Sequence, residues 1–177
     1  MAGSGDGGSA ARMHAYHAWA NGRVFGHLRT MPAGTAEREV TSVFPCVRHV
    51  LRHVLGADSL WLDVMAGLPR EEVMARMASV LTAIAAADLA ELESRFEDLA
   101  ARYRAFLAQD GVAERPVVAV HPGGARLKTT VAELVRHVGN HGTYHRGNIS
   151  AMLHQLGHRG VSTDYALFLM ETRGTAR

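Results

Sequence analysis

Residues 130–155 have the sequence TVAELVRHVGNHGTYHRGNISAMLHQ. Thr130, with Glu133 three residues later, forms the pattern of a capping box, which opens a helix by satisfying two of its free backbone N–H groups. Gly157 and Gly160 follow the segment, and glycine commonly ends a helix. The segment therefore predicts one long helix that runs from Thr130 to about Gln155.

This predicted helix carries a row of histidines. His141 and His145 are four residues apart, so their side chains lie one turn apart on the same face, and two imidazoles at this spacing can bind one metal ion. His137 continues the row one turn earlier. Three ligands along one straight helix would span about 12 Å, whereas a Zn–N bond is only ~2 Å long. A third ligand must therefore come from elsewhere in the chain.

An earlier predicted helix supplies a candidate for that ligand. His49 and His53 are four residues apart there, in an otherwise apolar run. A centre made of His53 and the pair His141 and His145 would leave a coordination position open to water or substrate. The same spacings also fit a structural role, because histidines four apart occur on exposed helix faces and a lone histidine on an apolar face is often a hydrogen-bonded core residue.

Other side chains near these histidines also have alternative roles. Cys46 lies seven residues before His53, about 10 Å along a helix, so we interpret it as a small buried thiol and not as a ligand. Asp58 could accept an N–H from a ligand or act as a base, although we expect a solvated charge. Arg146 could steer an anion or form a salt bridge. Three glycines in the last long helix predict close approach of a neighbour: Gly139, Gly142 and Gly147.

Helical periodicity dominates the rest of the chain. Further helices are predicted over Arg12–Met31, from Pro45 (with Thr41 or Ser42 as possible caps) to Gly67, over Arg70–Ala87, from an Asp88 N-cap to Gln109, and over Asp164–Thr172. A change of period at Pro116–Val120, a turn at His121–Gly124 and a second run at Ala125–Thr129 predict a β-hairpin. The pattern favours an all-α fold: a four-helix bundle with a short hairpin before the last long helix.

Composition limits the classes of protein. The 177 residues fit one domain, which we place at residues 12–177, after a Gly/Ser-rich stretch at residues 1–11 that we interpret as a flexible tail. The net charge is only +2 and no basic run is present, so we expect no nucleic-acid partner. No apolar window is long enough to span a membrane. A single cysteine excludes an intramolecular disulfide and favours a cytoplasmic protein.

Several of these segments together resemble the DinB/YfiT-like superfamily of small bacterial metalloproteins. The similar stretches are residues 16–21, ending in WAN; residues 51–61, LRHVLGADSLW; Arg115-Pro116 with the hairpin; and, most specific, residues 137–149, HVGNHGTYHRGNI. The resemblance covers nearly the whole chain after the tail. Two positions depart from the pattern: His17, where relatives often have Asn, and Asn148, where Gln is common.

The resemblance implies an up-down-down-up four-helix bundle, a homodimer, and one Zn or Ni ion per chain held by His53, His141 and His145. His49 and His137 match no ligand position of the family. The relatives include S-transferases and isomerases that use a low-molecular-weight thiol such as bacillithiol, mycothiol or glutathione, so a thiol cosubstrate and a small-molecule substrate are expected. A metal-dependent hydrolase and a non-catalytic, DNA-damage-inducible metal-binding protein are the alternatives.

Overall fold

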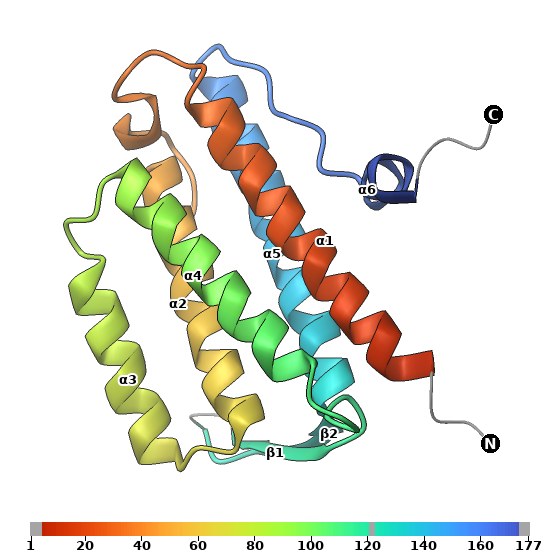
Figure 1. Cartoon of the computed structure of the whole chain (residues 1–177). Helices are drawn as coiled ribbons and strands as arrows, with labels where there is room; N and C mark the ends of the chain where they lie inside the picture. The colour runs from red at the N-terminus through yellow and green to blue at the C-terminus, as the bar shows by residue number, and fades with distance from the viewer. Residues whose placement is uncertain (1–4, 121–122, 174–177) are drawn as a thin grey trace.

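The computed structural model describes residues 5–120 and 123–173 of the chain. Its helices are α1 (Gly5–Leu28), a short 3₁₀ helix η1 (Thr35–Glu37), α2 (Val47–Ala66), α3 (Arg70–Ala83), α4 (Leu89–Leu107), α5 (Val131–Gln155) and α6 (Tyr165–Arg173). The strands β1 (Pro116–Val120) and β2 (Arg126–Thr130) form one antiparallel pair. The predicted all-α fold with a hairpin before the last long helix is confirmed (Figure 1). Among the described helices, none is long and apolar enough to cross a membrane.

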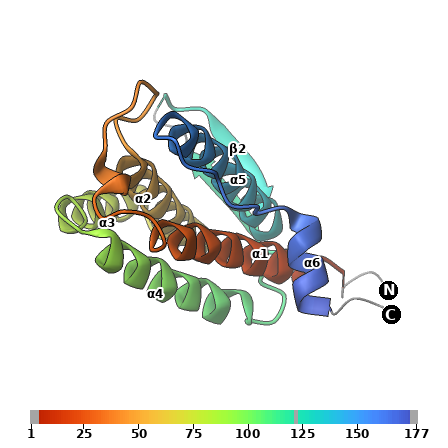
Figure 2. The same cartoon turned by 90° about the horizontal axis from the view of Figure 1, so that it is seen from above.

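The four long helices form the bundle. In Figure 1, α1 and α5 run upward while α2 and α4 run downward, so the predicted up-down-down-up order is confirmed. The shorter helix α3 returns the chain from the end of α2 to the start of α4. Helix α5 packs against both α1 and α2, and α4 packs against the same two helices from the other side (Figure 2). The pair α2 and α5, which carries the candidate ligands, is therefore antiparallel.

The predicted helix caps are present. The side chain of Asp88 accepts a hydrogen bond from the backbone N–H of Glu91 at 2.8 Å. Thr130 Oγ1 accepts one from the N–H of Glu133 at 3.4 Å, and the Glu133 carboxylate accepts the backbone N–H of Thr130 in return. The capping box therefore fixes the start of α5 directly after β2. Of the predicted hairpin turn, His121 and Pro122 lie outside the described residues.

Several predicted boundaries differ from those of the structure. Helix α1 begins at Gly5, so residues 5–11 are helical instead of forming a tail, and Ala10 among them packs in the core with 4% of its surface exposed. Helix α2 begins at Val47, after Cys46 as N-cap, and no side-chain cap bond forms there. Helix α3 ends at Ala83, before the predicted Ala87. The chain turns at that point because Ile84 and Ala87 are drawn into the core.

Glycines of α5 allow α1 to approach closely, as predicted. A Cβ built on Gly142 would lie 2.3 Å from the ring of His17, and one on Gly139 would lie 2.8 Å from the sulfur of Met13. At the third glycine, Gly147, such a Cβ would have no heavy atom within 4 Å apart from the adjacent residues and backbone of its own helix, so packing against other elements does not require glycine there. Helix α1 thus rests on α5 at the turn that contains His141.

A matched pair of substitutions tests this contact. Gly142→Ala should lower the free energy of unfolding by about 1–3 kcal/mol, because the buried His17 ring cannot move away from the added methyl group. Gly147→Ala should leave it unchanged or raise it by up to about 1 kcal/mol, through better helix propensity alone. Urea denaturation of the metal-free proteins measures both values. Equal effects of the two substitutions would show that His17 does not pack tightly on Gly142.

Candidate metal centre

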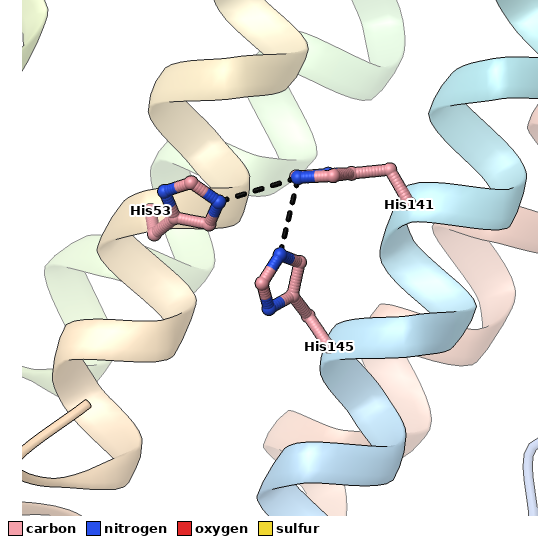
Figure 3. Close-up of side chains that lie close together, drawn as sticks. All are labelled: His53, His141 and His145. Carbon is pink, nitrogen blue, oxygen red and sulfur yellow. Dashed lines mark hydrogen bonds between the residues drawn. The ribbon is translucent and has the colours of Figure 1, made fainter. Parts of the chain in front are cut away.

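Three histidine side chains from two helices converge between α2 and α5. His53 Nε2 lies 3.2 Å from His141 Nε2, which in turn lies 3.1 Å from His145 Nε2 (Figure 3). Nitrogen atoms of the three rings all lie within 4.8 Å of one another. His53 projects from α2, while His141 and His145 project from successive turns of α5. The structure therefore brings together the three residues that the sequence singled out.

The donor set fits a divalent ion of the size of zinc. Two ligand nitrogens on a tetrahedral Zn lie about 3.3 Å apart, given Zn–N bonds of about 2.0–2.1 Å. The two Nε2 separations of 3.1 and 3.2 Å are close to that value. Burial differs along the cluster: His145 is 5% exposed, His141 is half-buried and His53 is exposed. One side of the cluster is therefore accessible, which would leave room for a further ligand.

Burial holds these imidazoles neutral, the form that binds metal. Desolvation, together with the neighbouring His141 and His53, lowers the pKa of His145 to about 4. Desolvation also lowers the pKa of His53 and of His141. At all three histidines the negative charge of Asp58 opposes this effect. The site is thus ready to coordinate at neutral pH without first losing protons.

Neighbouring groups orient two of the three rings, those of His53 and His145. The Phe44 ring packs against His53 and His145, with ring centroids 5.1 and 5.6 Å away. Asn148 lies 3.4 Å from Nδ1 of His145. The Nδ1 atom of His141 is buried and has no hydrogen-bond partner. His141 is therefore the one ring of the three with a buried, unsatisfied polar atom.

Three other candidates lie outside the cluster. The His137 ring packs edge-on against Trp61, with centroids 4.9 Å apart. His49 Nδ1 lies 3.1 Å from the sulfur of Cys46 at the start of α2, and Cys46 is buried, as predicted. The cluster of possible metal ligands found among the described residues includes none of these three.

Asp58 is buried, so our expectation of a solvated charge was wrong. Only 3% of its surface is exposed, and its Oδ2 lies 2.7 Å from Nε2 of His17 on α1. Arg146 NH1 lies 3.3 Å from the other ring nitrogen, Nδ1 of His17. Because arginine can only donate, Nδ1 of His17 accepts and its Nε2–H donates to Asp58. His17 thus joins α1, α2 and α5 through hydrogen bonds in the bundle interior.

Arg146 is buried in this interior and not at the surface. Its NH1 donates to Asn21 Oδ1 at 2.9 Å and its NH2 to Thr143 Oγ1 at 2.9 Å, while its guanidinium lies over the Tyr16 ring. The steering of an anionic substrate, one of its suggested roles, does not suit this position. We interpret Arg146 as a structural link between α5 and α1.

The buried polar contacts of His14 and Tyr103 were not predicted from the sequence. The two rings stack with centroids 4.3 Å apart, and the Tyr103 hydroxyl donates to the backbone oxygen of Asp58 at 2.8 Å. Burial lowers the pKa of His14 to about 3, helped by the nearby His17 and Arg104. The spacing of His14, His17 and Asn21 by three and four residues was the signal available: a polar stripe beside an apolar one on the first helix.

These features define a class: a four-helix bundle protein with a candidate site of three histidines between two helices that could hold a divalent metal ion. Comparison with known proteins gives the family. The sequence model of the DinB family matches residues 4–175. The chain is 39% identical over 164 residues to Protein DinB of Bacillus subtilis (strain 168), an alignment that covers 93% of this chain and 95% of that protein. The chain therefore belongs to the DinB family.

The lowered histidine pKa values predict how stability depends on pH. Below about pH 6.5 the unfolded chain takes up a proton at His14, whereas the folded chain does so only near pH 3. The free energy of unfolding of the metal-free protein should therefore fall as pH falls from about 6.5 toward 4. His14→Gln should reduce this slope by up to about 1.4 kcal/mol per pH unit.

Urea denaturation in the presence of a chelator at pH 7, 6 and 5 measures the slope. His154→Gln, a substitution at an exposed histidine near the end of α5, is the matched control and should leave the slope unchanged. A slope that is the same in His14→Gln as in the unsubstituted chain would contradict the assignment of His14 as a neutral buried group.

Proposed function

We propose that this DinB-family chain binds one Zn or Ni ion through His53, His141 and His145 and uses it to activate a low-molecular-weight thiol for transfer to, or isomerisation of, a small molecule. The convergence of the three imidazole nitrogens at separations near those of a tetrahedral site carries the proposal. Neutral imidazole suits both ions. The exposed His53 marks the side from which a thiol would enter.

A thiol cosubstrate is favoured over water by what surrounds the cluster. When bound, the metal ion would supply the positive charge that lowers the pKa of an incoming thiol to near neutrality. No carboxylate of the described residues joins the three histidines, and the sequence has no H-E-x-x-H glutamate to serve as a general base for water. Asp58, the acid whose charge acts on all three ligands, lies in the bundle interior with one carboxylate oxygen hydrogen-bonded to His17.

The nucleophilic sulfur would have to come from outside the chain. Cys46 is the only cysteine, and it is buried against His49, away from the cluster. Aromatic rings stand beside the ligands instead: Phe44 packs on His53, and the exposed Tyr144 packs edge-on against His145 with centroids 5.0 Å apart. These rings would pack against an organic substrate. The homodimer, the cytoplasmic location and the absence of nucleic-acid and membrane partners stay predictions.

Metal content tests the first half of the proposal. The purified protein should carry about one Zn or Ni per chain, and His141→Ala should abolish this, because His141 is the nitrogen donor that both other ligands approach. His137→Ala is the matched control: it removes an imidazole one turn earlier on the same helix and should leave the metal content unchanged. Elemental analysis of the three proteins decides. Full metal content in His141→Ala would remove that residue from the site.

Turnover tests the second half. The Zn-loaded protein should accelerate adduct formation between an electrophile and at least one of bacillithiol, mycothiol and glutathione, and His53→Ala should lose this activity. His49→Ala, which removes the other histidine of the same helix, should keep it. Thiol rates equal to those of His53→Ala, together with His53-dependent hydrolysis of esters or amides, would favour a hydrolase. No activity in either assay would favour a non-catalytic metal-binding protein.

A further inference from the structure

The carboxylate of Asp58 is only half satisfied. Its Oδ2 accepts the Nε2–H of His17 at 2.7 Å, but its Oδ1 is buried and has no hydrogen-bond partner. A buried carboxylate oxygen without a donor is costly, by about 1–3 kcal/mol or more. Among the described residues, this is the only buried side-chain oxygen in that state. Such an unmet acceptor points to a donor that the metal-free chain does not present.

Once a metal is bound, His141 would need a hydrogen-bond acceptor for its Nδ1–H. Its Nε2 faces the other two ligands, so the ion would bind there. An imidazole that binds metal through Nε2 keeps its proton on Nδ1, which then must donate a hydrogen bond. That Nδ1 is buried and without a partner. Because this atom is buried, we look for its acceptor among the protein's own groups.

We propose that, in the metal-loaded protein, Asp58 Oδ1 accepts the Nδ1–H of His141 and so positions that ligand. The inference rests on the proposed metal site. The acceptor is held in place by its hydrogen bond to His17. The His17 ring lies against Gly142, the residue next to His141. Of the charges that act on the His141 imidazole, that of Asp58 has the largest effect, and it raises the pKa of His141. Asp58 is then a positioning residue that acts on the metal through His141.

Arg146 offers the rival arrangement. Its Nε is also buried without a partner, so it could turn to Asp58 Oδ1 instead. Its other two nitrogens are already held by Asn21 and Thr143, which fixes the plane of the guanidinium. His141, by contrast, gains its need for an acceptor only on metal binding. The two arrangements differ in one observable, the state of the Nδ1 proton of His141.

Zinc affinity, measured by competition with a chelator, tests the proposal. Asp58→Asn should weaken zinc binding about 10–100-fold, the effect expected for loss of such a partner. Asp63→Asn is the matched control: Asp63 is a buried acid on the same helix whose carboxylate faces Arg102 and Arg76, so zinc affinity should stay within about twofold. Thermal unfolding of both metal-free variants shows whether they fold.

A second measurement uses the unsubstituted protein. In the zinc-loaded form, ¹⁵N-resolved NMR should show a His141 Nδ1–H that exchanges slowly with water and is shifted downfield by a carboxylate acceptor. A fast-exchanging or unshifted proton, or equal zinc affinity in Asp58→Asn and Asp63→Asn, would overturn the proposal. If the unsubstituted protein bound no zinc, the metal site itself would be wrong, a result distinct from either of these.

Discussion

The placement of the candidate site depends on the contact between His17 and Gly142. The His17 ring of α1 packs there directly on Gly142 of α5, and its two ring nitrogens join Arg146 of α5 and Asp58 of α2. Three of the four long helices are thus tied together at one level of the bundle. His141 and His145 lie next to this contact on successive turns of α5. The contact that fixes the fold therefore also fixes where two of the three imidazoles point.

Moving metal ligands out of water costs electrostatic free energy, and the use of histidines as ligands keeps this cost small. Three imidazoles can be buried as neutral groups, whereas three carboxylates would repel one another and resist desolvation. Burial lowers the pKa of each histidine and keeps it ready to bind a cation. The negative charge of Asp58 lies within the interior network and not in the cluster. A bound divalent ion would therefore keep most of its charge available to an incoming ligand.

Local signals predicted most of the fold. The capping box of Thr130, the N-cap at Asp88 and the 3.6-residue periodicity located the long helices within a few residues, except for the start of α1, because each signal acts over one or two turns. Helix geometry predicted that His141 and His145 could share an ion, but the same spacing relates His137 to His141, and the family resemblance decided between them. Residue spacing alone could not exclude His49 in place of His53 as the third ligand, because the face of α2 that meets α5 depends on tertiary packing. The burial of Asp58 and His14 could not be predicted, because it depends on partners from other helices that the sequence does not place: His17 for Asp58 and Tyr103 for His14.

We propose that one divalent ion is bound by three imidazoles and by an exchangeable fourth ligand. X-ray absorption spectroscopy at the zinc edge of the loaded protein tests it most directly. We expect three imidazole nitrogens at about 2.0–2.1 Å, with one further light-atom ligand that a sulfur at about 2.3 Å replaces when a thiol is added. A coordination shell with fewer than three imidazoles, or with four protein ligands that no thiol displaces, would contradict this proposal.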